Sequence, residues 1–248
     1  MKVVGIIPAR FASTRFPGKP LALIQGKTMI QRVYEQASQS AVLNDLYVAT
    51  DDERIENHVK EFGGKAMMTS ASHLTGTERC NEVISILAAK GSVFDVAINI
   101  QGDEPFINPE QIDLVAKCFS NKEVQIATLV KKISNAADLL NTSVMKVVVG
   151  LDNKALYFSR QPIPFIRGRQ NGDWLVHHTF YKHIGIYAYR AEVLTAIAKL
   201  QPTPLEMAES LEQLRWLENG YKIYVAFTEH ESHSIDTPED IDNATTDL

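Results

Sequence analysis

The sequence lacks several features that would define its class at once. Only two of its 248 residues are cysteines, Cys80 and Cys118, and no Cys-x-x-Cys pair occurs, so neither a disulfide framework nor a zinc knuckle is indicated. No apolar run approaches the length needed to cross a bilayer. Met1 to Val3 lead directly into the first predicted strand, which leaves no room for a signal peptide. We therefore expect a cytoplasmic protein with two reduced thiols and no membrane partner.

An excess of positive charge is also absent. The formal net charge is −5 and the pI is about 5.8, so no basic surface is offered to DNA or RNA, and we expect no nucleic-acid partner. Gly-x-Ser-x-Gly, Walker A and dinucleotide-binding motifs are missing, which leaves little support for a serine hydrolase, a P-loop NTPase or an NAD enzyme. Two histidine-containing segments, 177–178 and 230–233, have no third ligand at a convincing spacing, so a transition-metal site is not favoured.

Strand-like and helix-like segments alternate through the first half of the chain. Predicted strands are residues 3–7, 46–49, 66–68 and 95–100, and predicted helices are residues 28–40, 52–62, 76–89 and 109–119. Thr28 and Gln31 have the spacing of a capping box. This alternation is typical of βαβ units around a parallel sheet.

The second half is less regular. Predicted strands are residues 127–133, 144–149, 155–158, 183–189 and 222–227, and predicted helices are residues 191–200, 207–219 and a last one after Thr237-Pro238. Residues 151–154 suit a hairpin turn, so antiparallel pairing begins there. No segment resembles a linker, and the length suits one sizeable domain. We predict a single α/β domain, residues 1–248, with a mixed, mostly parallel sheet flanked by helices.

A basic loop follows the first predicted strand. The apolar run 3–7 ends at Pro8, and the loop then contributes Arg10, Arg15 and Lys19 among small residues and prolines. In open α/β sheets ligands bind outside the carboxyl ends of such strands, and backbone N–H groups of small residues approach anions closely. The loop predicts a polyphosphate site, although three scattered cations could also belong to a solvated loop without a ligand.

Two aspartates, Asp103 and Asp236, each have two interpretations, as a metal ligand or as a structural residue. Asp103 follows an apolar strand within Gln101-Gly102-Asp103-Glu104-Pro105, where it could hold Mg²⁺ against bound phosphates or simply form a turn. Asp236 precedes Thr237-Pro238, and these residues taken alone favour a helix cap over a metal ligand. The position of Asp103 at the end of a strand, like that of the basic loop, favours the metal role.

The order of residues 8–21 is Pro-Ala-Arg-x-x-Ser-Thr-Arg-x-Pro-x-Lys-Pro-Leu. It resembles the nucleotide-binding signature of the cytidylyltransferases that activate ulosonic acids. Related sugar-1-phosphate nucleotidyltransferases usually carry a Gly-Gly pair where Ala12-Ser13-Thr14 stands here. Further segments in the order of the family are residues 69–79, 101–105, 159–165, 182–187, 210–215 and 234–240. The resemblance extends from Ile7 to about Ile241.

This resemblance implies a Rossmann-like nucleotidyltransferase fold, with a nucleotide-binding half over about residues 1–120 and a sugar-binding and dimerisation half over about residues 121–248. The implied reaction transfers CMP from CTP to the anomeric hydroxyl of an ulosonic acid, above all 3-deoxy-D-manno-octulosonate (Kdo), with release of pyrophosphate, for lipopolysaccharide biosynthesis. It also implies Mg²⁺ as cofactor and a homodimer. The alternatives are a cytidylyltransferase for another acid sugar, such as an N-acylneuraminate, a nucleotide-sensing module, and a glycosyltransferase-like domain that binds a sugar nucleotide.

The resemblance also assigns roles residue by residue. Asp103 and Asp236 would hold Mg²⁺, and Lys19 would act as a point charge near the reacting oxygens. The residues implied in CTP binding are Arg10, Ser13, Arg15, Lys19, Ser70, Gly76, Thr77 and Arg79. The residues implied in sugar binding are Gln101, Arg160, His183, Tyr187, Glu212 and Gln213. Arg160 is our choice for the sugar carboxylate, because a guanidinium fork matches a carboxylate.

These residues have structural alternatives. Thr77 could be a helix N-cap and Arg79 an ordinary surface cation. Glu212 and Gln213 fall in the middle of a predicted helix, where such side chains are more often solvated. A strand histidine such as His183 more often has a structural role. No obvious general base is present, so we expect a metal to lower the pKa of the attacking sugar hydroxyl.

Overall fold

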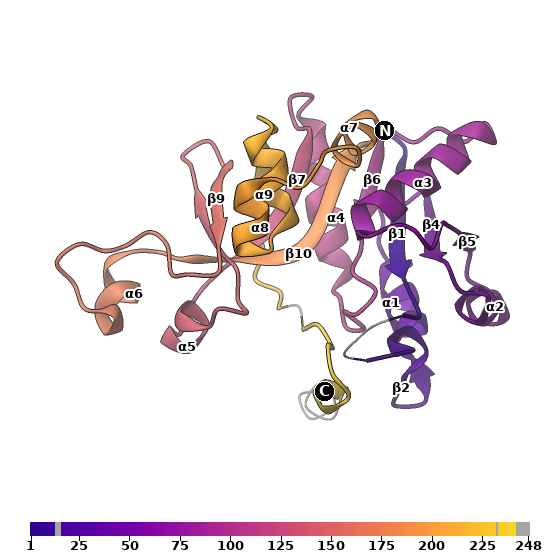
Figure 1. Cartoon of the computed structure of the whole chain (residues 1–248), viewed down its shortest axis with the longest axis horizontal. Helices are drawn as coiled ribbons and strands as arrows, with labels where there is room; N and C mark the ends of the chain where they lie inside the picture. The colour runs from indigo at the N-terminus through magenta and orange to yellow at the C-terminus, as the bar shows by residue number, and fades with distance from the viewer. Residues whose placement is uncertain (13–15, 232, 242–248) are drawn as a thin grey trace.

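The computed structural model describes residues 1–12, 16–231 and 233–241, and its first half is built on parallel strands (Figure 1). They are β1 (Val3–Ala9), β4 (Asp45–Thr50), β5 (Ala66–Met68) and β6 (Val96–Asn99). β1 lies between β4 and β6, and β5 follows β4, all in parallel pairs. Every residue of β6 is buried, as expected where helices cover both faces of a parallel sheet. The predicted parallel arrangement is confirmed.

The helices of this half begin at side chains that accept backbone N–H groups. They are α1 (Met29–Ala37), α2 (Glu53–Glu61), α3 (Gly76–Ala89) and α4 (Pro109–Lys117). Asp52 caps α2, and Asn108 caps α4 in a complete capping box. Thr75 caps α3, so the alternative that Thr77 is the N-cap is wrong. Thr28 accepts the N–H of Gln31, but the Gln31 side chain donates to Glu35, so the capping box predicted there is incomplete.

The second half adds strands to the same sheet. They are β7 (Ile126–Lys132), β8 (Lys146–Val149), β9 (Ala155–Ser159), β10 (Tyr181–Arg190) and β11 (Ile223–Phe227). β10 is antiparallel to both β6 and β7, and β11 is parallel to β7. The order along the main path is β11-β7-β10-β6-β1-β4-β5. The predicted mixed, mostly parallel sheet is therefore confirmed.

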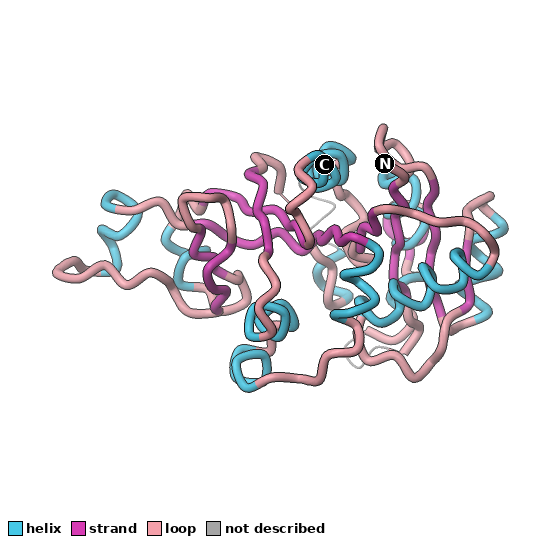
Figure 2. Tube along the Cα trace, turned by 90° about the horizontal axis from the view of Figure 1, so that it is seen from above, coloured by secondary structure: helices cyan, strands magenta, loops and turns pink. Residues whose placement is uncertain are grey.

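An antiparallel excursion leaves the sheet at β10. β8 pairs with β10 and with β9, and two short helices, α5 (Ala136–Leu140) and α6 (Trp174–His177), lie with this hairpin away from the parallel strands (Figures 1 and 2). A small apolar cluster that includes Trp174 and Phe180 packs inside it. The remaining small elements are β2 (Leu23–Ile24), β3 (Lys27–Thr28) and the 3-10 turns η1 (Lys19–Leu21), η2 (Cys118–Ser120) and η3 (Asn171–Asp173).

The predicted helix 207–219 is wrong as a single element. It is two helices, α8 (Pro204–Glu209) and α9 (Glu212–Glu218), separated at Ser210, whose φ is 53°. The Glu209 carboxylate accepts the Ser159 hydroxyl and the Arg160 N–H from the end of β9. This long-range contact ends α8 and lets α9 begin in a new direction.

Helices cover both faces of the sheet and enclose two apolar layers. Side chains of α1, α2 and α4 pack on one face, and those of α3, α7 (Ala191–Ile197) and α9 pack on the other. No helix among the described residues is long and apolar enough to cross a membrane. The core thus holds the carboxyl ends of β1 and β6 in a fixed relation, and the site described below lies at those ends.

Candidate active site

The carboxyl ends of β1 and β6 approach each other closely. A Cβ atom at Gly102 would stand 2.5 Å from the carbonyl oxygen of Pro8, a distance that backbone atoms do not tolerate. Only glycine therefore allows the chain to leave β6 so near to β1. This close approach brings Asp103 beside the start of the basic loop.

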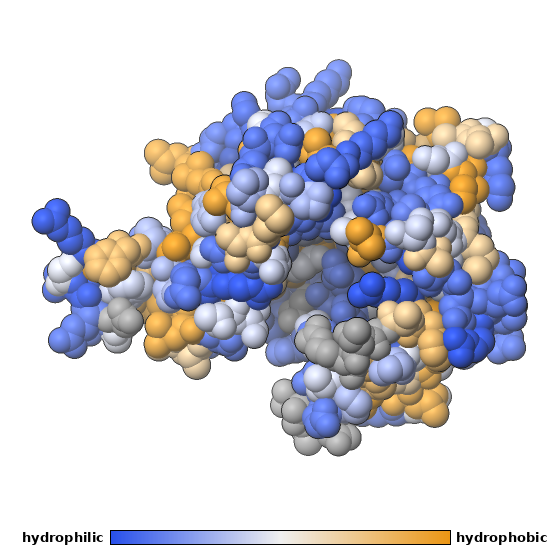
Figure 3. Space-filling view, viewed as in Figure 1, coloured by the Kyte–Doolittle hydropathy of each residue, from blue (hydrophilic) through white to orange (hydrophobic). Residues whose placement is uncertain are grey.

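A pocket of about 280 Å³ opens at this edge of the sheet. The residues that line this β1–β6 pocket are Pro8, Ala9, Arg10, Lys19, Pro20, His73, Leu74, Thr75, Gly76, Arg79, Asn99, Gln101, Gly102, Asp103 and Asp236. In the space-filling view a recess lies between the two halves of the chain, and hydrophilic side chains border much of it (Figure 3). The predicted basic loop and both predicted metal ligands meet in this pocket.

Lys19 joins the two aspartates. Its Nζ donates to Asp103 Oδ2 at 2.7 Å and to Asp236 Oδ1 at 3.4 Å, and also to the carbonyl oxygen of Ile235 at 3.0 Å. The Ile235 N–H donates to the Asp103 carbonyl oxygen at 2.9 Å, and the Ile235 side chain is fully buried. Two carboxylates far apart in the sequence therefore converge on one ammonium group.

This pair of carboxylates fits a magnesium ion. Mg²⁺ is usually bound by one or two carboxylates, with substrate oxygens and water as the other ligands. Within residues 1–12, 16–231 and 233–241, no group of three or more His, Cys, Asp or Glu side chains could hold a metal ion. Asp103 and Asp236 would thus hold the ion together with a bound substrate rather than in a closed protein cage.

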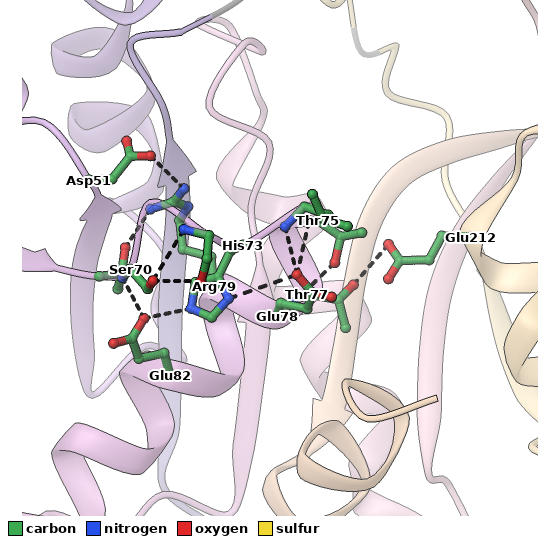
Figure 4. Close-up of polar contacts among 12 residues, drawn as sticks. Asp51, Ser70, His73, Thr75, Thr77, Glu78, Arg79, Glu82 and Glu212 are labelled. Atoms are coloured by element: carbon green, nitrogen blue, oxygen red, sulfur yellow. Dashed lines mark hydrogen bonds and ion pairs between the residues drawn. The ribbon is translucent and has the colours of Figure 1, made fainter. Parts of the chain in front are cut away.

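Segment 69–79 is tied to α3 by two glutamates one helical turn apart (Figure 4). Glu78 accepts the backbone N–H groups of two preceding residues, at 2.7 and 3.4 Å. Glu82 accepts the Ser70 N–H at 2.7 Å and contacts His73 Nε2 at 2.6 Å. These bonds hold His73 and its neighbours as one wall of the β1–β6 pocket.

Arg79 is a buried cation of this wall. Only 3% of the residue is exposed, and its guanidinium donates to Asp51 Oδ2 at 3.1 Å and to Thr69 Oγ1 at 2.5 Å. The alternative that Arg79 is an ordinary surface cation is therefore wrong. The paired charge keeps the guanidinium at the pocket without leaving a buried ion uncompensated.

A second pocket of about 160 Å³ adjoins the first and shares Gly76, Asn99 and Gln101 with it. The residues that line this β10–α9 pocket are Gly76, Thr77, Asn99, Gln101, Tyr187, Tyr189, Glu212, Gln213 and Trp216. Because the two pockets have a common wall, a group bound in one lies next to a group bound in the other.

The β10–α9 pocket contains buried polar groups that can form hydrogen bonds with a ligand. Thr77 Oγ1 donates to Glu212 Oε2 at 3.1 Å, and burial raises the pKa of the Glu212 carboxyl above its ordinary value of 4.5. The Tyr187 hydroxyl and Trp216 Nε1 are buried and meet no hydrogen-bond partner within the described part of the chain. Such groups suit a ligand that carries several hydroxyls.

Glu212 and Gln213 differ from the expectation for the middle of a helix. Glu212 is the first residue of α9 and partly buried, and Gln213 is buried. The alternative that both are solvated is therefore wrong, because the break at Ser210 turns the start of α9 toward β10 and α3.

Three predicted site residues line neither pocket. His183 is buried, accepts or donates a hydrogen bond with Thr128 Oγ1 at 2.9 Å, and burial lowers its pKa to about 3. Ser70 is exposed, and its N–H donates to Glu82, which also contacts His73. Arg160 donates from Nε to the Glu209 carbonyl at 2.7 Å and from its two Nη groups to carbonyls at 3.2 and 3.4 Å. Ser13 and Arg15 lie outside the described residues.

Several lining residues were not singled out from the sequence. His73, Leu74 and Thr75 belong to the segment that was recognised, but hydrogen bonds to α3 bring them to the pocket. Asn99 is the last residue of β6, two residues before Gln101. Because ligands bind at the carboxyl ends of such strands, this position could have indicated Asn99 as a site residue. Trp216 follows Glu212 by one helical turn, so the two side chains lie on the same face of α9. A correct prediction of where α9 begins would therefore have indicated Trp216 together with Glu212.

Comparison with known proteins agrees with this geometry. The profile of the cytidylyltransferase family matches residues 4–223. A 3-deoxy-manno-octulosonate cytidylyltransferase of Parabacteroides distasonis is 58% identical over 98% of this chain and 97% of its own length, and one of Geobacter metallireducens is 47% identical over 98% and 96%.

Solved structures show the same likeness. A CMP:2-keto-3-deoxy-manno-octonic acid synthetase complexed with CTP superposes with a TM-score of 0.89 at 41% identity, over 100% of both chains. A 4-diphosphocytidyl-2C-methyl-D-erythritol synthase of Anaerococcus prevotii, at 14% identity and a TM-score of 0.61 over 100% of this chain and 99% of its own, shares the fold alone. The chain therefore belongs to the cytidylyltransferase family, in the group of the 3-deoxy-manno-octulosonate cytidylyltransferases.

Proposed function

We propose that this protein transfers CMP from CTP to the anomeric hydroxyl of 3-deoxy-D-manno-octulosonate and releases pyrophosphate. The observation that carries the proposal is the convergence of Lys19, Asp103 and Asp236 in a pocket that adjoins a second, polar pocket. The names of relatives with 47–58% identity over nearly the whole chain support the choice of sugar.

The β1–β6 pocket is the proposed CTP site. Arg10 and Lys19 line it, together with the buried Arg79, and these cations would offset the charge of a triphosphate. Ser13 and Arg15 would complete the basic loop, and Gly76 lines the pocket where the base and the ribose are expected. Thr77, also predicted for CTP, lines the adjoining β10–α9 pocket instead, and Ser70 would act only through its neighbours.

Asp103 and Asp236 would hold Mg²⁺. The ion would neutralise charge on the phosphoryl oxygens and lower the pKa of an oxygen bound to it. Lys19, now between the two carboxylates, carries a charge that can turn toward the phosphate oxygens once those carboxylates have another cation. Its proposed role is to stabilise the charge that develops on the reacting and leaving oxygens.

The β10–α9 pocket is the proposed sugar site. Gln101, Tyr187, Glu212 and Gln213 line it and offer donors and acceptors for sugar hydroxyls. Arg160 is proposed for the sugar carboxylate, and to reach it the two Nη groups would leave exposed hydrogen bonds of 3.2 and 3.4 Å.

In the proposed reaction the anomeric oxygen bonds to the α-phosphorus, the bond from the α-phosphorus to the bridging oxygen breaks, and pyrophosphate leaves. The hydroxyl proton passes to water. His183 is not the general base of this reaction. Burial lowers its pKa to about 3, far below the value near 7 that suits a base at neutral pH. The chain therefore acts through positioning and electrostatics.

Pyrophosphate release tests the function. The assay uses each of the four ribonucleoside triphosphates with Kdo, an N-acylneuraminate and other acid sugars, and release is expected only with CTP and Kdo. Nucleotide binding without release would instead support a sensing module. Consumption of a ready-made sugar nucleotide would support a glycosyltransferase-like function, and preference for another acid would move the protein to a sister specificity.

We also propose a homodimer formed by the antiparallel excursion. Five large apolar side chains in the described residues of this part are exposed, Leu140, Leu151, Leu156, Phe165 and Val176, and exposed apolar surface of this extent is typical of interaction sites. Light scattering coupled to size exclusion should give twice the mass of 27.7 kDa. A monomer at micromolar concentration would contradict this.

A further inference from the structure

The segment that carries Asp236 crosses from the sheet to the β1–β6 pocket as an extended strap, residues 228–236, of which residue 232 lies outside the described part (Figure 1). The Thr228 N–H donates to the Val130 carbonyl of β7 at 3.0 Å, where the strap leaves β11. Ile235 fastens the other end through its buried side chain and its bond to Asp103. Glu231 lies between these two attachments.

Within the described residues, the histidines and glutamates of this strap belong to no group of three or more side chains that could hold a metal ion. His230 Nδ1 contacts Asn108 Nδ2 at 3.0 Å, and its Nε2 contacts Glu110 Oε2 at 2.8 Å, so His230 is tied to the start of α4. Glu231 instead contacts a lysine of β7 and a lysine of β10. His230 and Glu231 therefore attach the strap to two different parts of the protein, the start of α4 and the strands β7 and β10.

Two lysines face each other where Glu231 arrives. Lys131 on β7 and Lys182 on β10 are directly opposed in the antiparallel register, a placement of like charges that is unfavourable unless an anion lies between them. The Glu231 carboxylate fills this role, with Oε2 at 2.7 Å from Lys131 Nζ and Oε1 at 2.5 Å from Lys182 Nζ. Asp138 of α5 also contacts Lys182 Nζ, at 2.9 Å.

The strength of this bridge follows from its partial burial. Side-chain exposure is 21% for Lys131, 13% for Lys182 and 32% for Glu231, so the bridge is screened less than a surface ion pair. Burial by itself raises the pKa of Glu231, but the hydrogen bonds from Lys131 and Lys182 outweigh it and leave the pKa below its ordinary value. Glu231 is therefore ionised at neutral pH and bound to both strands.

We propose that Glu231 is a positioning residue for Asp236, and that the Lys131–Glu231–Lys182 bridge holds the strap so that the Asp236 carboxylate meets Lys19 and Asp103. The inference rests on the proposed function, in which Asp236 acts on the phosphoryl group. Four residues lie between Glu231 and Asp236, and the five steps along the chain span about 18 Å at most, so the bridge limits the positions that Asp236 can reach.

The test replaces Glu231 by Gln, which keeps the size of the side chain and removes its charge. Mn²⁺ binding to the full-length protein with CTP, without the sugar, is measured by electron paramagnetic resonance. Because a carboxylate ligand is loosened, the Kd for Mn²⁺ is expected to rise about tenfold and kcat to fall about tenfold or more, while KM for CTP changes about twofold at most. The melting temperature reports whether the variant is folded.

Glu229→Gln is the matched control. It makes the same chemical change two residues earlier on the same strap, at an exposed side chain, and should leave Mn²⁺ binding and kcat at the wild-type values. A folded Glu231→Gln protein that matches this control in both measurements would overturn the proposal. If Glu231→Gln does not fold, Lys131→Gln removes one of the two cations and should weaken Mn²⁺ binding in the same direction, and an unchanged Kd would overturn the proposal.

The outcome separates this inference from the proposed function. Wild-type protein that releases no pyrophosphate would refute the function, yet the difference in Mn²⁺ affinity between the two variants would still test the strap. If the wild type is active and the Glu231→Gln variant has the same Kd for Mn²⁺ and the same kcat, only the positioning role of Glu231 is refuted.

Discussion

Replacement of Asp103 by Asn is the most direct test of the candidate site. The substitution keeps the shape of the side chain and removes one of the two charges that converge on Lys19 Nζ. We expect the protein to fold and bind CTP but to turn over very slowly. The reason is that a loss of negative charge at this point weakens the hold on Mg²⁺, while the remaining pocket is unchanged.

The magnitude follows from the geometry. The Lys19–Asp103 pair has a distance of 2.7 Å, and its side chains are 15% and 27% exposed. Because Lys19 keeps the Asp236 carboxylate and the Ile235 carbonyl as partners after the substitution, we expect a loss of stability of about 1 kcal/mol. In a chain of this size that corresponds to a shift of about 4 °C or less in Tm. Metal stabilisation of phosphoryl charge is worth several kcal/mol, and a loss of about 3 kcal/mol lowers kcat about 150-fold.

The assay is steady-state pyrophosphate release at saturating CTP and Kdo, together with a melting curve. Asp152→Asn is the matched control, because Asp152 lies in the exposed hairpin turn beside Lys154 and should leave kcat unchanged. An Asp103→Asn enzyme with kcat within about threefold of wild type, a loss of less than about 1 kcal/mol, would refute the metal site. A collapse of Tm would show instead that Asp103 is needed for the fold.

Three further substitutions test the sugar side of the site. Arg160→Lys should raise KM for Kdo about tenfold and leave KM for CTP unchanged, because lysine lacks the planar fork; a lower Tm with both KM values unchanged would assign Arg160 to structure alone. Tyr187→Phe should raise KM for Kdo and stabilise the protein by about 1 kcal/mol, because the buried hydroxyl meets no hydrogen-bond partner in the described part of the chain. Chemical denaturation measures the change in stability, and a loss of stability would contradict this prediction. Glu212→Gln tests a pH effect. Burial raises the folded-state pKa of Glu212 above its ordinary 4.5, so the folded state binds more protons than the unfolded state between those two pKa values and stability falls as pH rises through that window. The variant should therefore melt higher than wild type at about pH 7 but not at about pH 4, and equal melting at both would contradict the pKa shift.

Lys19 shows how much of the site could be predicted before the fold was known. The sequence placed its loop at the end of a strand and Asp103 at the end of another, because apolar runs, prolines and a Gly-Asp turn are local signals. That Lys19 Nζ would lie between Asp103 and Asp236 could not be read from them. The contact joins segments more than 80 residues apart in the chain, since the separations from Lys19 are 84 and 217 residues, and depends on the close approach that Gly102 allows.

The sequence by itself determined the alternation of strands and helices, the basic loop and most helix starts, because periodicity, caps and turns act over a few residues. Only the tertiary structure decided which charged and polar side chains are enclosed. Arg79 is buried because Asp51 and Thr69 accept its N–H groups, and α9 starts afresh because Glu209 binds the end of β9. The physical reason is that burying a charge or breaking a helix is unfavourable locally and becomes stable only when distant groups supply the partner.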